Sequence, residues 1–169
     1  MLQTDTFLAV ASQLVFNACE IIREAVQHTD LHITMKSENN PVTITDIKIQ
    51  TIILSYLRAV WPTIHIVGEE AIEYQGELTH STANLLESLE MAKCFTNSSS
   101  ELELNKVCVW VDPLDGTNGF CSGNLDEITV LIGLSYEGKA RLGIIGVPYY
   151  RDEHHNLVYC PKIIYGDAE

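Results

Sequence analysis

The feature that most constrains the fold is a run of strand-like segments in the second half of the chain. These segments are KVCVWV (106–111), EITVLIGLSY (127–136) and ARLGIIGV (140–147). They are rich in Val and Ile, which favour strands, and the Glu-Gly pair at 137–138 predicts a hairpin between the last two.

The first half of the chain has helical periodicity instead. The first helix is predicted from apolar residues at helical spacing, namely Phe7, Ala11, Leu14, Val15, Ala18, Ile22 and Val26. SENNPVT (37–43) then predicts a loop, and a second helix is predicted from Thr45 or Asp46 to a point before Pro62. A short strand is predicted over 64–67 and a third helix over 81–93. Helices followed by consecutive strands predict an α+β fold.

Composition excludes several classes of protein. The 169 residues are 46% hydrophobic, which is enough for one domain with a buried core. A net charge of −13 argues against nucleic acid as a partner, because neutralising phosphates needs Lys and Arg. The N-terminal segment has no basic start and its apolar stretches are interrupted, so neither a signal peptide nor a membrane partner is predicted. Five scattered cysteines without a Cys-x-x-Cys pair favour a reducing compartment, and we expect a cytoplasmic protein.

The segment VWVDPLDGTNGF (109–120) places two acids at the end of an apolar strand. We expect the strand to end at Asp112, Pro113 to stop the ladder, and a short helix to follow through Phe120. Asp112 and Asp115 can then point into one pocket, where Mg²⁺ would relieve their repulsion with help from the Leu114 carbonyl. The amides of Gly116 and Thr117 could face an anion. The alternative is an ordinary turn in which Asp caps its own backbone.

Two further acidic sites could join this pocket. IVGEE ends an apolar strand with Glu69 and Glu70, although a solvated loop would have the same pattern. VTITD places Asp46 at the start of the second helix, where helix capping is the alternative role.

Taken in order, VTITD, GEE and WVDPLDGTNGF resemble the lithium-sensitive, magnesium-dependent phosphatase family that includes inositol monophosphatases and bisphosphate nucleotidases. LDEITVLIGLSYEGKARLGIIGVPYY (125–150) looks most like the 3'(2'),5'-bisphosphate nucleotidase branch. The resemblance implies the N-terminal lobe of a layered α/β sandwich, in which helices pack on a mainly antiparallel sheet.

The resemblance also implies roles for particular residues. Asp46 and Thr117 would orient or deprotonate the attacking water, and Gly116 with Thr117 would bind phosphate. The implied magnesium ligands are Glu69, Asp112, Asp115 and the carbonyl of Leu114. The implied substrate is adenosine 3',5'-bisphosphate, hydrolysed to AMP and phosphate. Asn118 departs from the lysine common in that branch, which keeps inositol phosphates as the alternative substrate.

Family members continue beyond this point with a C-terminal lobe whose Trp-Asp motif completes the second metal site. We therefore expect residues 1–169 to form the metal-binding catalytic lobe, without the C-terminal lobe. A truncated, non-catalytic member is a further alternative. For the isolated chain we expect weak magnesium binding, lost on Asp112→Asn, and little turnover, because the second cation would lack a carboxylate.

Overall fold

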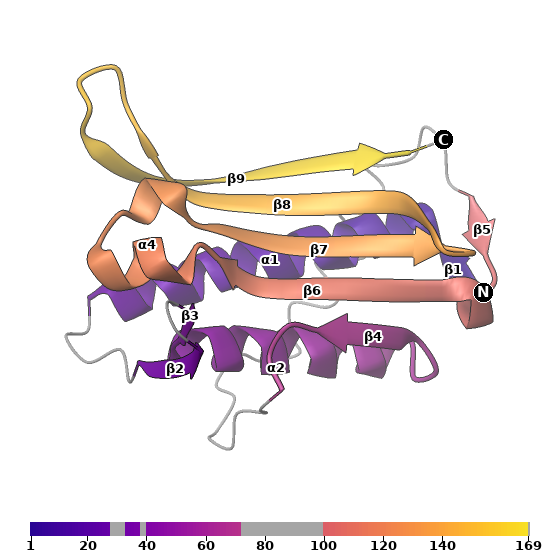
Figure 1. Ribbon diagram of the computed structural model, residues 1–169. Helices are drawn as coiled ribbons and strands as arrows, with labels where there is room; N and C mark the ends of the chain where they lie inside the picture. The colour runs from indigo at the N-terminus through magenta and orange to yellow at the C-terminus, as the bar shows by residue number, and fades with distance from the viewer. Residues whose placement is uncertain (28–32, 38–39, 72–99, 169) are drawn as a thin grey trace.

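The fold is organised around a five-stranded sheet of order β4-β6-β7-β8-β9, with two helices packed on one of its faces (Figure 1). The computed structural model describes residues 1–27, 33–37, 40–71 and 100–168. The helices are α1 (Thr4–Val26), α2 (Ile44–Val60) and α4 (Thr117–Ser122). The strands are β1 (Leu2–Gln3), β2 (Thr34–Ser37), β3 (Asn40–Val42), β4 (His65–Gly68), β5 (Glu101–Leu102), β6 (Val107–Asp115), β7 (Thr129–Tyr136), β8 (Lys139–Arg151) and β9 (Leu157–Asp167).

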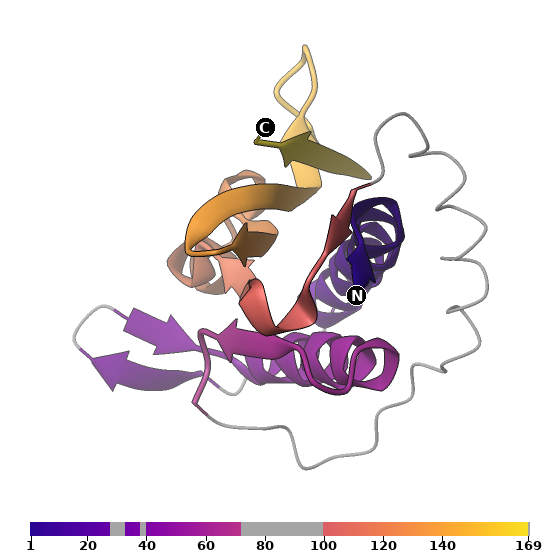
Figure 2. The same cartoon turned by 90° about the vertical axis from the view of Figure 1, so that its right-hand side faces the viewer.

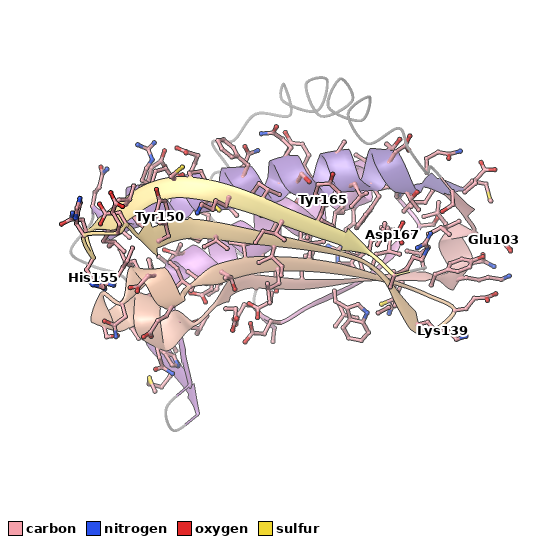
Figure 3. All side chains as sticks on the ribbon, turned by 90° about the horizontal axis from the view of Figure 1, so that it is seen from above. Glu103, Lys139, Tyr150, His155, Tyr165 and Asp167 are labelled. Carbon is pink, nitrogen blue, oxygen red and sulfur yellow. The ribbon has the colours of Figure 1, made fainter. Side chains whose placement is uncertain are left out.

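Strand β4 runs parallel to β6, and the other neighbours in this sheet are antiparallel. The predicted α+β class, with helices on a mainly antiparallel sheet, is confirmed. The predicted hairpin is also confirmed, because Glu137 and Gly138 both have positive φ between β7 and β8. The β8–β9 connection near His155 lies at the opposite end of the sheet from Lys139 (Figure 3).

The core lies between the sheet and the two long helices. Helix α1 packs on β7, β8 and β9, and α2 packs on β6 and β4, so both helices cover the same side (Figure 2). Alternate residues of β6, namely Val107, Val109 and Val111, point into this core, as the period-two pattern of a half-covered strand requires. Of the first helix's predicted apolar positions only Val26 is exposed.

Helix α1 is long and apolar enough to cross a membrane by composition alone. In the fold, however, 67% of its most apolar 18-residue window is buried inside the protein. The helix therefore supplies one wall of the hydrophobic core.

The other face of the sheet carries apolar side chains that no described element covers. Trp110 on β6 is exposed, as are Ile145 on β8 and its register partner Ile164 on β9. Tyr165 on β9 is exposed as well, but it points to the helix side of the sheet, like its register partner Ile144. We call the uncovered surface, defined by Trp110, Ile145 and Ile164, the open face.

Three predictions about elements were wrong or incomplete. The loop predicted over 37–43 contains β3, which pairs with β2 through Met35 and Pro41. Strand β6 does not end at Asp112: it continues to Asp115, because a bulge between these residues accommodates Pro113 without a ladder hydrogen bond. Beyond 147 the sheet gains the rest of β8 and all of β9. The third helix predicted over 81–93 lies outside the described residues.

Candidate active site

Asp46 lies in the first turn of α2 and is almost completely buried, with 1% of its surface exposed. Thr43 is the N-cap, and its backbone N–H donates to Asp46 Oδ2 over 2.8 Å. The Thr43 hydroxyl accepts from the Asp46 N–H over 3.4 Å, and these two reciprocal bonds form a capping box. The same hydroxyl also donates to Asp46 Oδ2. The helix therefore begins one to two residues earlier than predicted, and Asp46 has the capping role that was its alternative assignment.

The capping bonds use Asp46 Oδ2, so Asp46 Oδ1 remains for a contact with the turn formed by Asp115, Gly116 and Thr117. Thr117 Oγ1 lies 3.0 Å from Asp46 Oδ1 and 3.0 Å from the carbonyl oxygen of Leu114. A hydroxyl has a single proton, so Thr117 donates to one of these acceptors at a time. The structure thus brings together Asp46 and Thr117, which are 71 positions apart in the sequence.

Gly116 fixes the backbone that presents Thr117. It is the N-cap of α4, with φ of 86°, and a Cβ atom added there would lie 2.6 Å from the carbonyl oxygen of Glu127. Both the left-handed conformation and this close approach require glycine. The short helix predicted to follow is confirmed as α4.

Burial and hydrogen bonding act in opposite directions on Asp46. Desolvation raises the pKa of its carboxyl group, whereas the hydrogen bonds from Thr43 and Thr117 lower it, and the net shift is upward. Asp46 is therefore a more basic carboxylate than one in water, and it lies within hydrogen-bonding distance of a hydroxyl.

Glu69 directly follows β4, and Asp112 lies at the start of the bulge in β6, the adjacent parallel strand. Gly68 of β4 pairs with Val111 of β6, and the Glu69 N–H donates to the Val111 carbonyl over 3.0 Å. The parallel register puts Glu69 beside Asp112. Both residues line a cavity of about 390 Å³ whose other walls are Val67, Gly68, Trp110, Val111, Leu131 and Gly133.

The two carboxyl groups perturb each other. Burial, the charge of Glu69, a side-chain hydrogen bond with Glu69 and the charge of Asp115 together raise the pKa of Asp112 to about 7. The Leu114 N–H, 3.2 Å from Asp112 Oδ1, partly opposes this rise. A hydrogen bond between two carboxyl groups needs a proton, and a cation between them would replace that proton.

The donor chemistry of these residues fits a hard divalent cation, because the groups are carboxylates and a carbonyl. Asp115 accepts a hydrogen bond from the Thr129 hydroxyl over 3.3 Å. Over the described residues, no group of three or more His, Cys, Asp or Glu side chains is arranged to hold a metal ion. The structure does bring the carboxyl groups of Glu69 and Asp112 together. That Asp115 and the Leu114 carbonyl complete the ligand set stays a prediction. Phosphate binding by Gly116 and Thr117 also stays a prediction.

Thr43 is not among the predicted site residues, although it bonds to Asp46 through both its hydroxyl and its backbone N–H. The available signal was the Thr-x-x-Asp spacing over 43–46, which is a variant of the capping box. Thr43 itself is completely buried.

Comparison with known proteins supports the family inferred from the motifs. Residues 3–160 match the Inositol monophosphatase family. The rat protein named 3'(2'),5'-bisphosphate nucleotidase 1 is 38% identical over 146 residues, covering 85% of this chain and 47% of the rat protein. The chain thus spans about half the length of this curated relative.

Two solved structures share the fold. A Bartonella henselae protein described as extragenic suppressor protein suhB has a TM-score of 0.61 at 21% identity, covering 90% of this chain and 51% of that one. A protein described as an IMPase/NADP phosphatase complexed with NADP and Ca²⁺ has a TM-score of 0.53 at 18% identity, covering 88% and 45%. With the family match over most of its length, the chain belongs to the inositol monophosphatase family.

Proposed function

We propose that this chain is the N-terminal catalytic lobe of a magnesium-dependent phosphomonoesterase of the 3'(2'),5'-bisphosphate nucleotidase type. Its reaction would be hydrolysis of adenosine 3',5'-bisphosphate to AMP and phosphate. The observation that carries this proposal is the Asp46–Thr117 hydrogen bond of 3.0 Å. Thr117 comes just after the β6 bulge that begins at Asp112, so this bond connects the buried Asp46 carboxylate to the segment that carries the candidate cation ligands. The similarity to the rat nucleotidase supports this choice of substrate.

The chain's residues divide into two groups with separate tasks. Glu69, Asp112, Asp115 and the Leu114 carbonyl would hold the cation, which when bound acidifies water and offsets phosphoryl charge. Thr117 would accept a proton from the attacking water while passing its own proton to Asp46, which is held in place by Thr43. The backbone at Gly116 would then lie next to the phosphoryl group.

The acidic composition agrees with this division of tasks. A protein of net charge −13 repels a phosphorylated substrate unless cations lie between them. We expect the protein to function in the cytoplasm and to need Mg²⁺ for substrate binding as well as turnover.

The test is phosphate release by the protein expressed from its complete reading frame. With Mg²⁺ present, we expect faster hydrolysis of adenosine 3',5'-bisphosphate than of inositol 1-phosphate. The opposite ranking supports the inositol phosphatase alternative. Magnesium binding without turnover of either substrate supports the non-catalytic alternative.

A further inference from the structure

Gln50 makes two hydrogen bonds to the backbone of a single distant residue. It lies on α2, four positions after Asp46, and only 2% of its surface is exposed. Its Nε2 donates to the Glu70 carbonyl over 2.7 Å, and its Oε1 accepts from the Glu70 N–H over 2.8 Å. The side-chain amide therefore pairs with Glu70 as a neighbouring strand would, directly after β4 ends.

Glu69 is consequently held from both sides. Its own N–H is bonded to the Val111 carbonyl of β6, and the next residue is clamped by Gln50. Between these two attachments the backbone of Glu69 has little freedom to move. Its side chain is then kept beside Asp112, with which it shares the cavity wall.

Gly68 makes room for this clamp. A Cβ atom added to Gly68 would lie 2.4 Å from Gln50 Oε1 and 2.6 Å from its Cδ. Gly68 is not among the residues with positive φ, so it is needed for this close approach rather than for its conformation. Gln50 and Gly68 form a matched pair, and both polar atoms of the Gln50 amide are bonded to Glu70.

We propose that Gln50 is a positioning residue that fixes Glu69 for cation binding. This proposal rests on the proposed function, since the cation is the one inferred there. Because Gln50 and Asp46 lie on the same helix, α2 fixes the positions of both the proton-accepting Asp46 carboxylate and Glu69. A neutral amide is needed because Glu70 presents one donor and one acceptor, and a carboxylate offers no proton to the Glu70 carbonyl.

The test is magnesium binding by the 169-residue chain, measured by calorimetry. Gln50→Met keeps a similar volume without either hydrogen bond, and we expect roughly 10-fold weaker binding, as for other groups that orient metal ligands. Gln13→Met is the matched control, because it removes a side-chain hydrogen bond to Asn17 within α1 and leaves α2 unchanged. It should leave the affinity within about twofold of the unmodified chain.

A second arm does not depend on Gln50→Met folding well. Gly68→Ala should weaken magnesium binding by a similar factor, and the same substitution in a Gln50→Ala chain should add little, because the clashing amide is gone. Amide hydrogen exchange should show faster exchange of the Glu70 N–H in the Gln50 variants, at protein concentrations where they remain folded.

The outcomes separate the two proposals. If the unmodified chain binds magnesium but both Gln50→Met and Gly68→Ala retain its affinity, the positioning role is wrong and Gln50 only stabilises the fold. Unchanged exchange of the Glu70 N–H in Gln50→Met also contradicts the clamp. If the unmodified chain binds no magnesium while Gln50→Met still speeds exchange, the proposed function fails although the clamp exists.

Discussion

The Thr117 hydroxyl is the group whose removal best separates proton transfer from cation binding. Thr117→Val keeps the shape of the side chain but removes the bond to Asp46 Oδ1. In the protein expressed from its complete reading frame, we expect phosphate release to fall about 100-fold or more, the range for loss of a positioned proton-transfer group. Magnesium affinity should change little, and Thr117→Ser should restore most of the rate.

Thr51→Val is the matched control for this prediction. It removes a hydroxyl that bonds to the Ile47 carbonyl within α2. If both valine variants lose activity equally, the effect belongs to helix stability, and Thr117 has no special part in the reaction.

Asp112 gives the metal-free protein a pH-dependent stability. Its pKa is about 7 in the fold against 3.8 for the ordinary group, so its stabilising contribution is present below pH 3.8 and is lost as pH rises through 7. Asp112→Asn should therefore raise the free energy of unfolding at pH 8 by about 1–2 kcal/mol, a figure reduced for partial exposure to water. Urea unfolding in EDTA at pH 5 and pH 8 measures this.

Magnesium should reverse the order of the two proteins. An excess of Mg²⁺ should stabilise the unmodified chain at pH 8, because a ligand that binds only the folded state adds to its stability, and should leave Asp112→Asn unchanged. Equal stabilisation of both would show that the cation binds elsewhere.

At the scale of elements, the contact between α1 and β8 is set by a single glycine. A Cβ atom at Gly146 would lie 2.3 Å from Val15 Cγ1 and 3.1 Å from Cys19 Sγ, so Gly146→Ala should destabilise the protein by about 1–3 kcal/mol through overpacking. Gly143→Ala is its control on the same strand, because a Cβ there meets nothing within 4 Å. Thermal unfolding of both variants tests whether α1 packs this closely on β8 at Gly146. Equal melting temperatures for the two variants would contradict this close packing.

The elements that sequence analysis predicted are those with a local cause. Helix α2 and the β7–β8 hairpin follow from apolar periodicity and from the residues at 137–138. The course of β6 through Pro113 could not be predicted, since the bulge depends on its pairing with β7. The site divides in the same way. The Asp46–Thr117 contact was implied by family resemblance alone, and the partner of Gln50 is the backbone of a residue 20 positions later.

For the whole molecule, the open face is the surface most exposed to unwanted association. Ile145 and Ile164 are register partners on this face, and both are exposed. We expect the 169-residue chain to self-associate as its concentration rises, because contiguous apolar surface drives association. Ile164→Lys should reduce this association in sedimentation velocity experiments without lowering the melting temperature. An unmodified chain that stays monomeric at every concentration would contradict the prediction.

Trp110 also gives the protein an intrinsic fluorescence signal for cation binding. The other tryptophan, Trp61, is buried at 7% exposure against the Phe7 ring, whereas Trp110 is 53% exposed and shares the cavity wall with Glu69 and Asp112. Its indole N–H is anchored to Ser135 Oγ over 3.2 Å, so the fluorophore has a defined place beside the carboxylates. Binding of a divalent ion in the cavity should change the red-edge emission of Trp110 and leave the blue emission of Trp61 constant. Cation binding can therefore be titrated by fluorescence without a label. Trp110→Phe is the control, because its emission should not respond to the ion.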